Sequence, residues 1–255
     1  MSHQPDAKPL DAWLAESLRV TVFPSPAASL ADQRWWEQLV GQPPETQTSQ
    51  PRKGGRKDEG PYEGGKLVLD CETTRIDWHL VPAAPSEETD QAFPNIGTYP
   101  ESLALFSQLI RRWLGLDDFP PINRLAVGSI LLHPVDSLSH GYRQLTDYLP
   151  SVQIDPNGSS DFQYQINRPR ESRSGVSGLR INRLSKWSVA TIRLFTLTGA
   201  GPSSRAEAQH HARRLQLDVN TAAEFDTELP ADGLIPLLQE LVELAGEIAS
   251  HGDIP

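Results

Sequence analysis

The sequence predicts an α+β protein with a mixed, largely antiparallel sheet packed by about five helices. Segments of strand composition and amphipathic segments are mixed along the whole chain, which is typical of this class. The 22 Pro and 18 Gly predict many turns between these segments. In the last segment, apolar residues recur at alternating spacings of four and three from Leu234 to Ile248, which indicates a helix with one buried face.

The first elements are expected within residues 17–65. Residues 17–23 have strand composition and end at a Pro-Ser-Pro turn. Ser29 is a suitable N-cap for a helix over residues 30–40, and Gly41 is a suitable stop. Residues 42–65 are polar, rich in Pro and Gly and free of periodicity, so they are predicted to form a flexible loop or linker.

Residues 66–133 are predicted to contain a strand or hairpin, a helix and a further strand. Alternating apolar residues favour a long strand or hairpin over 66–81. Pro100 is placed to start a helix that continues to residue 114, and its apolar residues fall at helical spacing. Residues 122–133 form the most apolar strand candidate in the chain.

The C-terminal part is predicted to alternate helices with strands. Ser137 can cap a short helix, and three strand segments follow between residues 162 and 197. Ser204 and Glu207 form a capping-box pattern, which predicts a helix to about residue 214. A strand is expected over 215–221, followed by the last helix with Asp232 as its cap.

The tripeptide Ile-Asn-Arg occurs three times, at 122, 166 and 181, and two copies continue to Leu. One interpretation is a duplication, with two similar β–α halves at 12–120 and 121–255 within a single domain covering 1–255. A second interpretation is strand geometry, because alternation places Ile and Arg on one face and Asn on the other. In a third interpretation, arginines from neighbouring strands converge on an anion.

The charge is unevenly distributed. The chain carries −10 overall, but residues 164–214 hold ten Lys or Arg and two acids, a net charge of +8 that leaves −18 for the rest. Such asymmetry predicts a surface for a polar partner or for nucleic acid, and it also fits pairing within the molecule. The residues predicted to bind a partner or nucleic acid are Arg168, Arg170, Arg173, Arg180, Arg183, Lys186, Trp187 and Trp35.

Trp35 and Trp36 are adjacent on a predicted helix, so their side chains point about 100° apart. One of them is expected in the core and the other is a candidate partner anchor. The single cysteine, Cys71, excludes an internal disulfide, and the sequence shows neither a secretory signal nor an apolar span. We therefore expect a cytoplasmic protein without a membrane partner.

Catalytic patterns are weak. Cys71 and His79 can meet only if residues 66–81 fold as a hairpin. Asp70 and Glu72 share a strand face and, with a third acid and Lys66, would suit a metal-dependent hydrolase, a pattern that is common by chance. Nucleotide-binding loops and metal motifs are absent from the sequence, so the prediction is no cofactor, no resident metal and no catalytic residue.

The C-terminal stretch resembles the ending of a sporadically distributed family of uncharacterised bacterial proteins. The matching residues are Leu217, Asp218, Val219 and Thr221, followed by the helix over 237–248, with a looser match at residues 18–23. The resemblance implies an accessory role, such as a mobile-element, toxin-related or antiviral locus, and no catalytic residues. Taken together, the sequence predicts a non-enzymatic adaptor or regulatory protein that binds another protein of the same locus or a second copy. Nucleic-acid or anion binding is the first alternative, and metal-dependent hydrolysis is the second.

Overall fold

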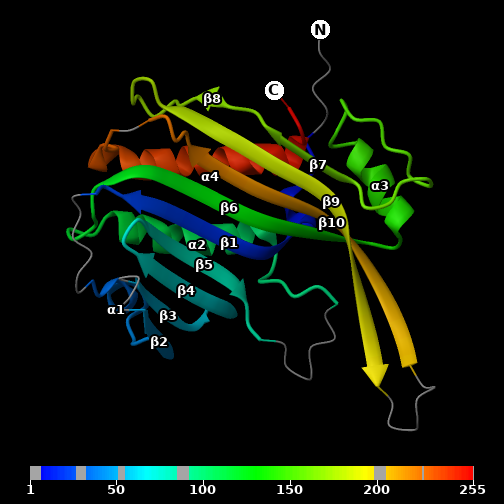
Figure 1. Cartoon of the computed structure of the whole chain (residues 1–255), viewed down its shortest axis with the longest axis horizontal. Helices are drawn as coiled ribbons and strands as arrows, with labels where there is room; N and C mark the ends of the chain where they lie inside the picture. Colours follow the sequence, from blue (N-terminus) through cyan, green and yellow to red (C-terminus); the bar gives the residue numbers. More distant parts are fainter. Residues whose placement is uncertain are drawn as a thin grey trace.

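The computed structural model describes residues 7–26, 33–50, 55–84, 92–197, 205–225 and 227–254. It is an α+β fold built on one ten-stranded sheet, in which every pairing is antiparallel (Figure 1). The strand order is β2-β3-β4-β5-β1-β6-β10-β9-β7, and the short β8 also pairs with β9. The strands are β1 (Leu14–Pro24), β2 (Thr46–Gln50), β3 (Gly55–Tyr62), β4 (Gly65–Glu72), β5 (Arg75–Pro82), β6 (Ile122–Val135), β7 (Gln163–Asn167), β8 (Arg170–Glu171), β9 (Arg180–Leu197) and β10 (Arg205–Thr221).

Four α-helices and two short 3-10 helices occur in the described residues, rather than about five α-helices as the sequence predicted. They are η1 (Leu10–Ala12), α1 (Trp35–Val40), α2 (Tyr99–Leu114), α3 (Leu138–Thr146), η3 (Ala231–Gly233) and α4 (Leu234–His251). The helix predicted over 204–214 is wrong, because residues 205–214 belong to β10 and pair with β9. The locally helix-prone sequence yields there to long-range strand pairing.

The core lies between the sheet and the helices. Each α-helix contributes apolar side chains to one cluster with alternate residues of the central strands, among them Leu18, Val127 and Leu217. The predicted stripe on the last helix is confirmed, because its members are all buried: Leu234, Leu238, Leu241, Ala245 and Ile248. Ser137 caps α3 as predicted, since its hydroxyl accepts a hydrogen bond from the backbone N–H of His140 at 3.2 Å.

The prediction of a loop or linker over residues 42–65 is wrong for most of that stretch. It contains β2 and β3, at one end of the sheet, while residues 51–54 lie outside the described part. The polar composition misled the prediction because a strand of an antiparallel sheet can have one solvated face, and β3 fills buried positions with Gly60 and with Asp58, which pairs with Arg56 at 3.0 Å. Gly60 in β3 has a specific role, since a Cβ there would lie 3.0 Å from the ring of Trp36.

The order of elements is similar in two parts of the chain. Residues 14–114 run β1-α1-β2-β3-β4-β5-α2, and residues 122–251 run β6-α3-β7-β8-β9-β10-α4. In each part the first strand lies at the centre of the sheet, and the last strand lies beside it. The first strands, β1 and β6, pair with each other, so the junction between the two parts is at the middle of the sheet.

The β9–β10 hairpin extends beyond the rest of the sheet as a two-stranded arm (Figure 1). Pairing between β10 and β6 stops at His211 and Val135, whereas pairing between β9 and β10 continues to Leu197 and Arg205. The sequence predicted two strands, 178–185 and 187–197, where the structure has the single strand β9. The cap predicted at Ser204 falls outside the described residues, as do residues 198–203.

Candidate functional site

The predicted basic cluster is neutralised largely by α4 and its C-terminal end. Arg168 donates two hydrogen bonds of 2.8 and 2.9 Å to the carboxylate of Asp253, and Arg170 donates two of 3.0 Å to the carboxylate of Glu247. Arg173 contacts Glu240 and Glu243 on the same helix. The structure therefore pairs much of the basic segment with acidic residues of the same chain.

The other predicted binding residues are divided between the core and the surface. Arg180 lies 3.5 Å from Glu171, and Arg183 is buried. Trp187 and Trp35 are fully buried, so the prediction that they form an exposed binding surface is wrong. Lys186 is the exception, because it faces the groove described below.

Neither tryptophan of the predicted pair is an exposed anchor. Trp36 stacks on Trp78 with ring centroids 6.0 Å apart, and Trp35 packs edge-on against Trp113. Both belong to the core because α1 packs against two elements at once: Trp35 contacts Trp113 on α2, and Trp36 contacts Trp78 on β5.

The geometry of the Ile-Asn-Arg repeats follows strand alternation. In β9, Ile181 and Arg183 are buried on the helix-covered face, while Asn182 lies on the opposite face. The copy in β6 departs from this pattern because a register irregularity separates Ile122 from Arg124. The copies fall in non-equivalent strands, so they do not mark the two similar halves.

Residues 66–81 form the predicted hairpin, yet it does not bring Cys71 to His79. Cys71 packs toward the core, where burial raises the pKa of its thiol to about 12, whereas His79 lies on the opposite face. Burial and the nearby Glu72 raise the pKa of Asp70. No group of three or more potential metal ligands occurs in the described residues, so Asp70 and Glu72 lack the third ligand that the hydrolase prediction needs.

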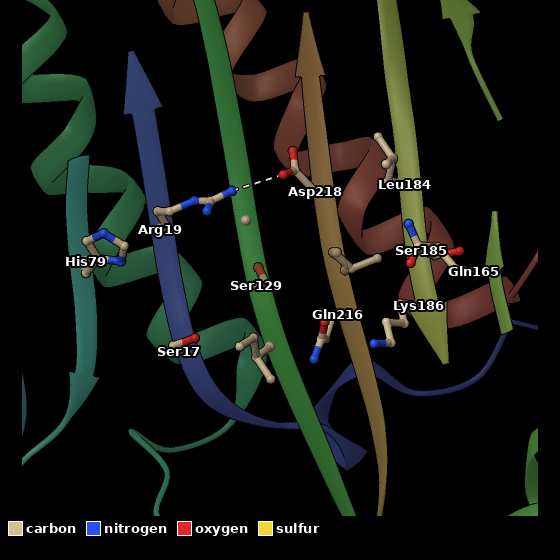
Figure 2. A pocket seen from close by; sticks show the side chains of 13 residues that line it. Ser17, Arg19, His79, Ser129, Gln165, Leu184, Ser185, Lys186, Gln216 and Asp218 are labelled. Atoms are coloured by element: carbon tan, nitrogen blue, oxygen red, sulfur yellow. Dashed lines mark hydrogen bonds and ion pairs between the residues drawn. The ribbon is translucent and has the colours of Figure 1, made fainter. Parts of the chain in front are cut away.

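The face of the sheet opposite the helices, called here the helix-free face, carries a network of polar side chains. Arg19 in β1 extends across β6 and donates to Asp218 in β10 at 3.0 Å (Figure 2). Gly128 of β6 makes this crossing feasible, because a Cβ there would lie 3.1 Å from Arg19 Nε. An ion pair thus joins the two parts of the chain across the central strand.

A ladder of amides continues from Asp218 toward the edge of the sheet. Asn220 donates to Asp218 at 2.7 Å, Asn182 donates to Asn220 at 3.1 Å, and Asn167 donates to Asn182 at 2.9 Å. Two of these asparagines come from the Ile-Asn-Arg repeats. The repeats therefore contribute a surface network through Asn rather than a convergent set of arginines.

A polar groove of about 390 Å³ lies along this network. Its lining residues come from six strands, and Figure 2 shows their side chains spread across the sheet face. The charged and amide groups are Arg19, His79, Asp218, Lys186, Gln165 and Gln216. Burial lowers the pKa of His79, with further lowering by Arg19 and Arg75, while Asp77 opposes the shift. Lys186 makes no hydrogen bond or ion pair with the described residues, so its ammonium group is available to a partner.

A second, mainly apolar groove of about 670 Å³ adjoins the first at the base of the arm. The two grooves share Ser17. Phe93 from the segment after β5 packs there against Leu132 and Ala212. The remaining apolar lining comes from Val81, Pro82, Ala83, Ala84, Pro94, Ala190 and Ile192, and charged groups are supplied by Glu16, Lys66 and Arg214.

Sequence reasoning missed Arg19, Gly128 and Asp218. Each lies on the helix-free face of its strand, with Gly128 covered by Arg19, and the two charged residues are 199 positions apart, so no local pattern links them. Asp218 was noted only in the family resemblance. The alternation of polar residues along β1 and β10 was the available signal, but it does not reveal which strands are adjacent.

Comparison with known proteins identified no relative: no family model, curated protein or solved structure matches this chain. The resemblance to an uncharacterised bacterial family stays a prediction. In the described residues, no helix has the length and apolar character needed to cross a membrane.

Proposed function

We propose that this protein is a non-enzymatic, partner-binding protein that uses the helix-free face of its sheet as the binding surface. The observation that carries the proposal is the pair of adjoining grooves on that face, one polar and one apolar, at the base of the arm. Protein-binding sites typically combine an apolar centre with polar groups that fix orientation.

The state of the charges on this face supports recognition. Arg19 is held by Asp218, and Arg214 is held by Glu16 at 3.1 Å, so both side chains are fixed before a partner arrives. A fixed side chain loses less conformational entropy when it is covered. Lys186 supplies the additional cation and favours an acidic group on the partner.

The location of the grooves supports a role that depends on both parts of the chain. The polar groove spans β5 and β1 of the first part and β6, β10, β9 and β7 of the second. We infer that the two similar β–α halves arose by duplication and that their junction forms the binding surface. The cellular role, an accessory function in a bacterial system, remains part of this proposal.

The nucleic-acid alternative has less support than the charge asymmetry suggested. Four arginines of the basic segment form ion pairs with carboxylates of the same chain: Arg168, Arg170, Arg173 and Arg180. Arg183 is buried and is not exposed to a nucleic acid. An arginine that already binds a carboxylate must give up that ion pair before it binds a phosphate. The net electrostatic contribution to nucleic-acid binding is therefore smaller than for an unpaired arginine.

The test is capture of partners by the tagged protein from its native host, with and without nuclease, read by mass and by nucleic-acid staining. We expect a discrete protein that survives nuclease and is lost with Lys186→Glu or with Ala190→Trp, which fills the apolar groove. Leu105→Glu is the matched control, since Leu105 is 40% exposed on α2. A partner retained by both groove variants, or one that disappears with nuclease, would contradict the proposal. Light scattering of the purified protein identifies the case in which the partner is a second copy.

A further inference from the structure

Arg183 is an unusual feature of the helix-covered face. Its side chain is 1% exposed, and none of its three guanidinium nitrogens makes a hydrogen bond. A buried cation without hydrogen bonds is strongly unfavourable, so such a group normally has an acceptor close by. The carboxylates nearest to Arg183 show why it lacks an acceptor.

The neighbouring carboxylates are already engaged. Glu247 lies 3.8 Å from Arg183 but is bound by both nitrogens of Arg170. Asp253 is bound by Arg168, and its Oδ2 also accepts hydrogen bonds from Tyr164 at 2.8 Å and Ser151 at 3.4 Å. Three guanidinium groups therefore face two carboxylates, and the cluster carries one uncompensated positive charge.

The space between Arg183 and Asp253 is small. Arg183 and Asp253 line it together with Gly252 and Ile254, and it has no room for a water molecule. The segment after α4 closes it, with the Asp253 N–H donating to the Tyr148 carbonyl at 2.8 Å. Access to Arg183 therefore requires that the Asp253 side chain move aside.

We propose that Arg168, Arg183, Tyr164 and Ser151 form a binding site for a tetrahedral oxyanion of the phosphate class, which Asp253 occupies as a built-in substitute. The two carboxylate oxygens of Asp253 are used by Arg168, Tyr164 and Ser151, so none is left for Arg183. A phosphate group has further oxygens, and it can accept from both guanidinium groups at once. The low pKa that Arg168 gives Asp253 agrees with a site that favours negative charge.

This site lies on the side of the sheet away from the two grooves, so the proposal stands apart from partner binding. Exchange of Asp253 for a phosphate would release the segment after α4 from Arg168. Phosphate binding would thus change the contacts of the segment that follows α4, while Glu247 on α4 remains bound to Arg170.

The experiment measures the thermal unfolding midpoint and isothermal titration with inorganic phosphate, with sodium chloride as a control at equal ionic strength. We expect phosphate to raise the midpoint of the wild type and to bind Asp253→Asn about tenfold more tightly, because the competing carboxylate is gone. Arg183→Met should lose the phosphate response, and Arg111→Met, an exposed arginine on α2, should keep it. Phenyl phosphate distinguishes a phosphate monoester from the free ion, since only an accessible site accepts the larger group.

Two results would overturn the proposal. One is a phosphate response equal to that of chloride in both the wild type and Asp253→Asn. The other is an undiminished phosphate response in Arg183→Met or, if that variant does not fold, in Arg168→Met, whose side chain is 35% exposed. Partner capture through Lys186 does not depend on these outcomes, so failure here leaves the proposed function to its own test.

Discussion

The two faces of β9 and β10 differ in what their residues do. On the helix-covered face, Trp187 and Leu215 are fully buried and Arg183 is enclosed with them. On the helix-free face of the same strands, Lys186 and Asp218 line a groove. Because alternate residues of one strand serve the two faces, neighbouring substitutions should separate stability from recognition.

The largest expected difference between the two faces is on β5, where Trp78→Ala is compared with His79→Ala. Trp78 is fully buried between Trp36 and Trp113, with centroid distances of 6.0 and 5.9 Å. We expect Trp78→Ala to lower the free energy of unfolding by about 3–5 kcal/mol, measured by urea denaturation. His79→Ala, one position along the strand and on the other face, should cost less than about 1 kcal/mol. Equal losses would show that the helix-free face is as important for stability as the core.

The next effect concerns Asp253, on the helix-covered side, and it depends on pH. Arg168 holds the pKa of this carboxyl below the usual Asp value of about 3.9. A depressed folded-state pKa stabilises the fold above the usual value, and this contribution is lost as the pH falls through the folded-state pKa. Asp253→Asn should therefore lower stability at pH 7 by about 1–3 kcal/mol and flatten the stability profile below about pH 4. Circular dichroism from pH 7 to 2 measures this loss of stability. If Asp253→Asn and the wild type lose stability equally below pH 4, the role given to the Arg168–Asp253 pair is contradicted.

A smaller effect is expected at Gly128, on the helix-free face. In Gly128→Val the added side chain would displace Arg19, whose guanidinium lies 3.1–3.3 Å from the Cβ position. Loss of the partly exposed Arg19–Asp218 pair should cost about 1 kcal/mol in the free energy of unfolding. Arg19→Met tests the same ion pair without altering the backbone position. If Gly128→Val were neutral while Arg19→Met was destabilising, the crossing over β6 would be tolerant of a side chain.

The sequence predicted the covered face better than the helix-free face. Leu238 and Leu241 on α4 and Ile76, Trp78 and Leu80 on β5 are regularly spaced, so local periodicity was enough to place them in the core. The network on the other face depends on which strands are adjacent. Asn167, Asn182 and Asn220 meet only because β7, β9 and β10 are neighbours in the sheet.

The ion pairs of the basic segment could not be predicted from local sequence patterns for the same reason. Arg168 and Asp253 are 85 positions apart, and the charge count alone cannot tell an internal partner from an external one. The misplaced helix at 204–214 is a related error, since its residues have local helix propensity and are held as a strand by β9.

The smallest expected change in stability, and the most direct test of recognition, is at Lys186. Its side chain makes no ion pair with the described residues, so Lys186→Glu should leave the free energy of unfolding within about 0.5 kcal/mol of the wild type. Partner capture should nevertheless fall, because the reversed charge repels the acidic group that we expect on the partner. Lys186→Gln serves as the intermediate case, with a weaker loss that becomes smaller at high salt. If capture is unchanged by Lys186→Glu while Ala190→Trp abolishes it, the partner binds in the apolar groove, and the charge in the polar groove does not contribute to recognition.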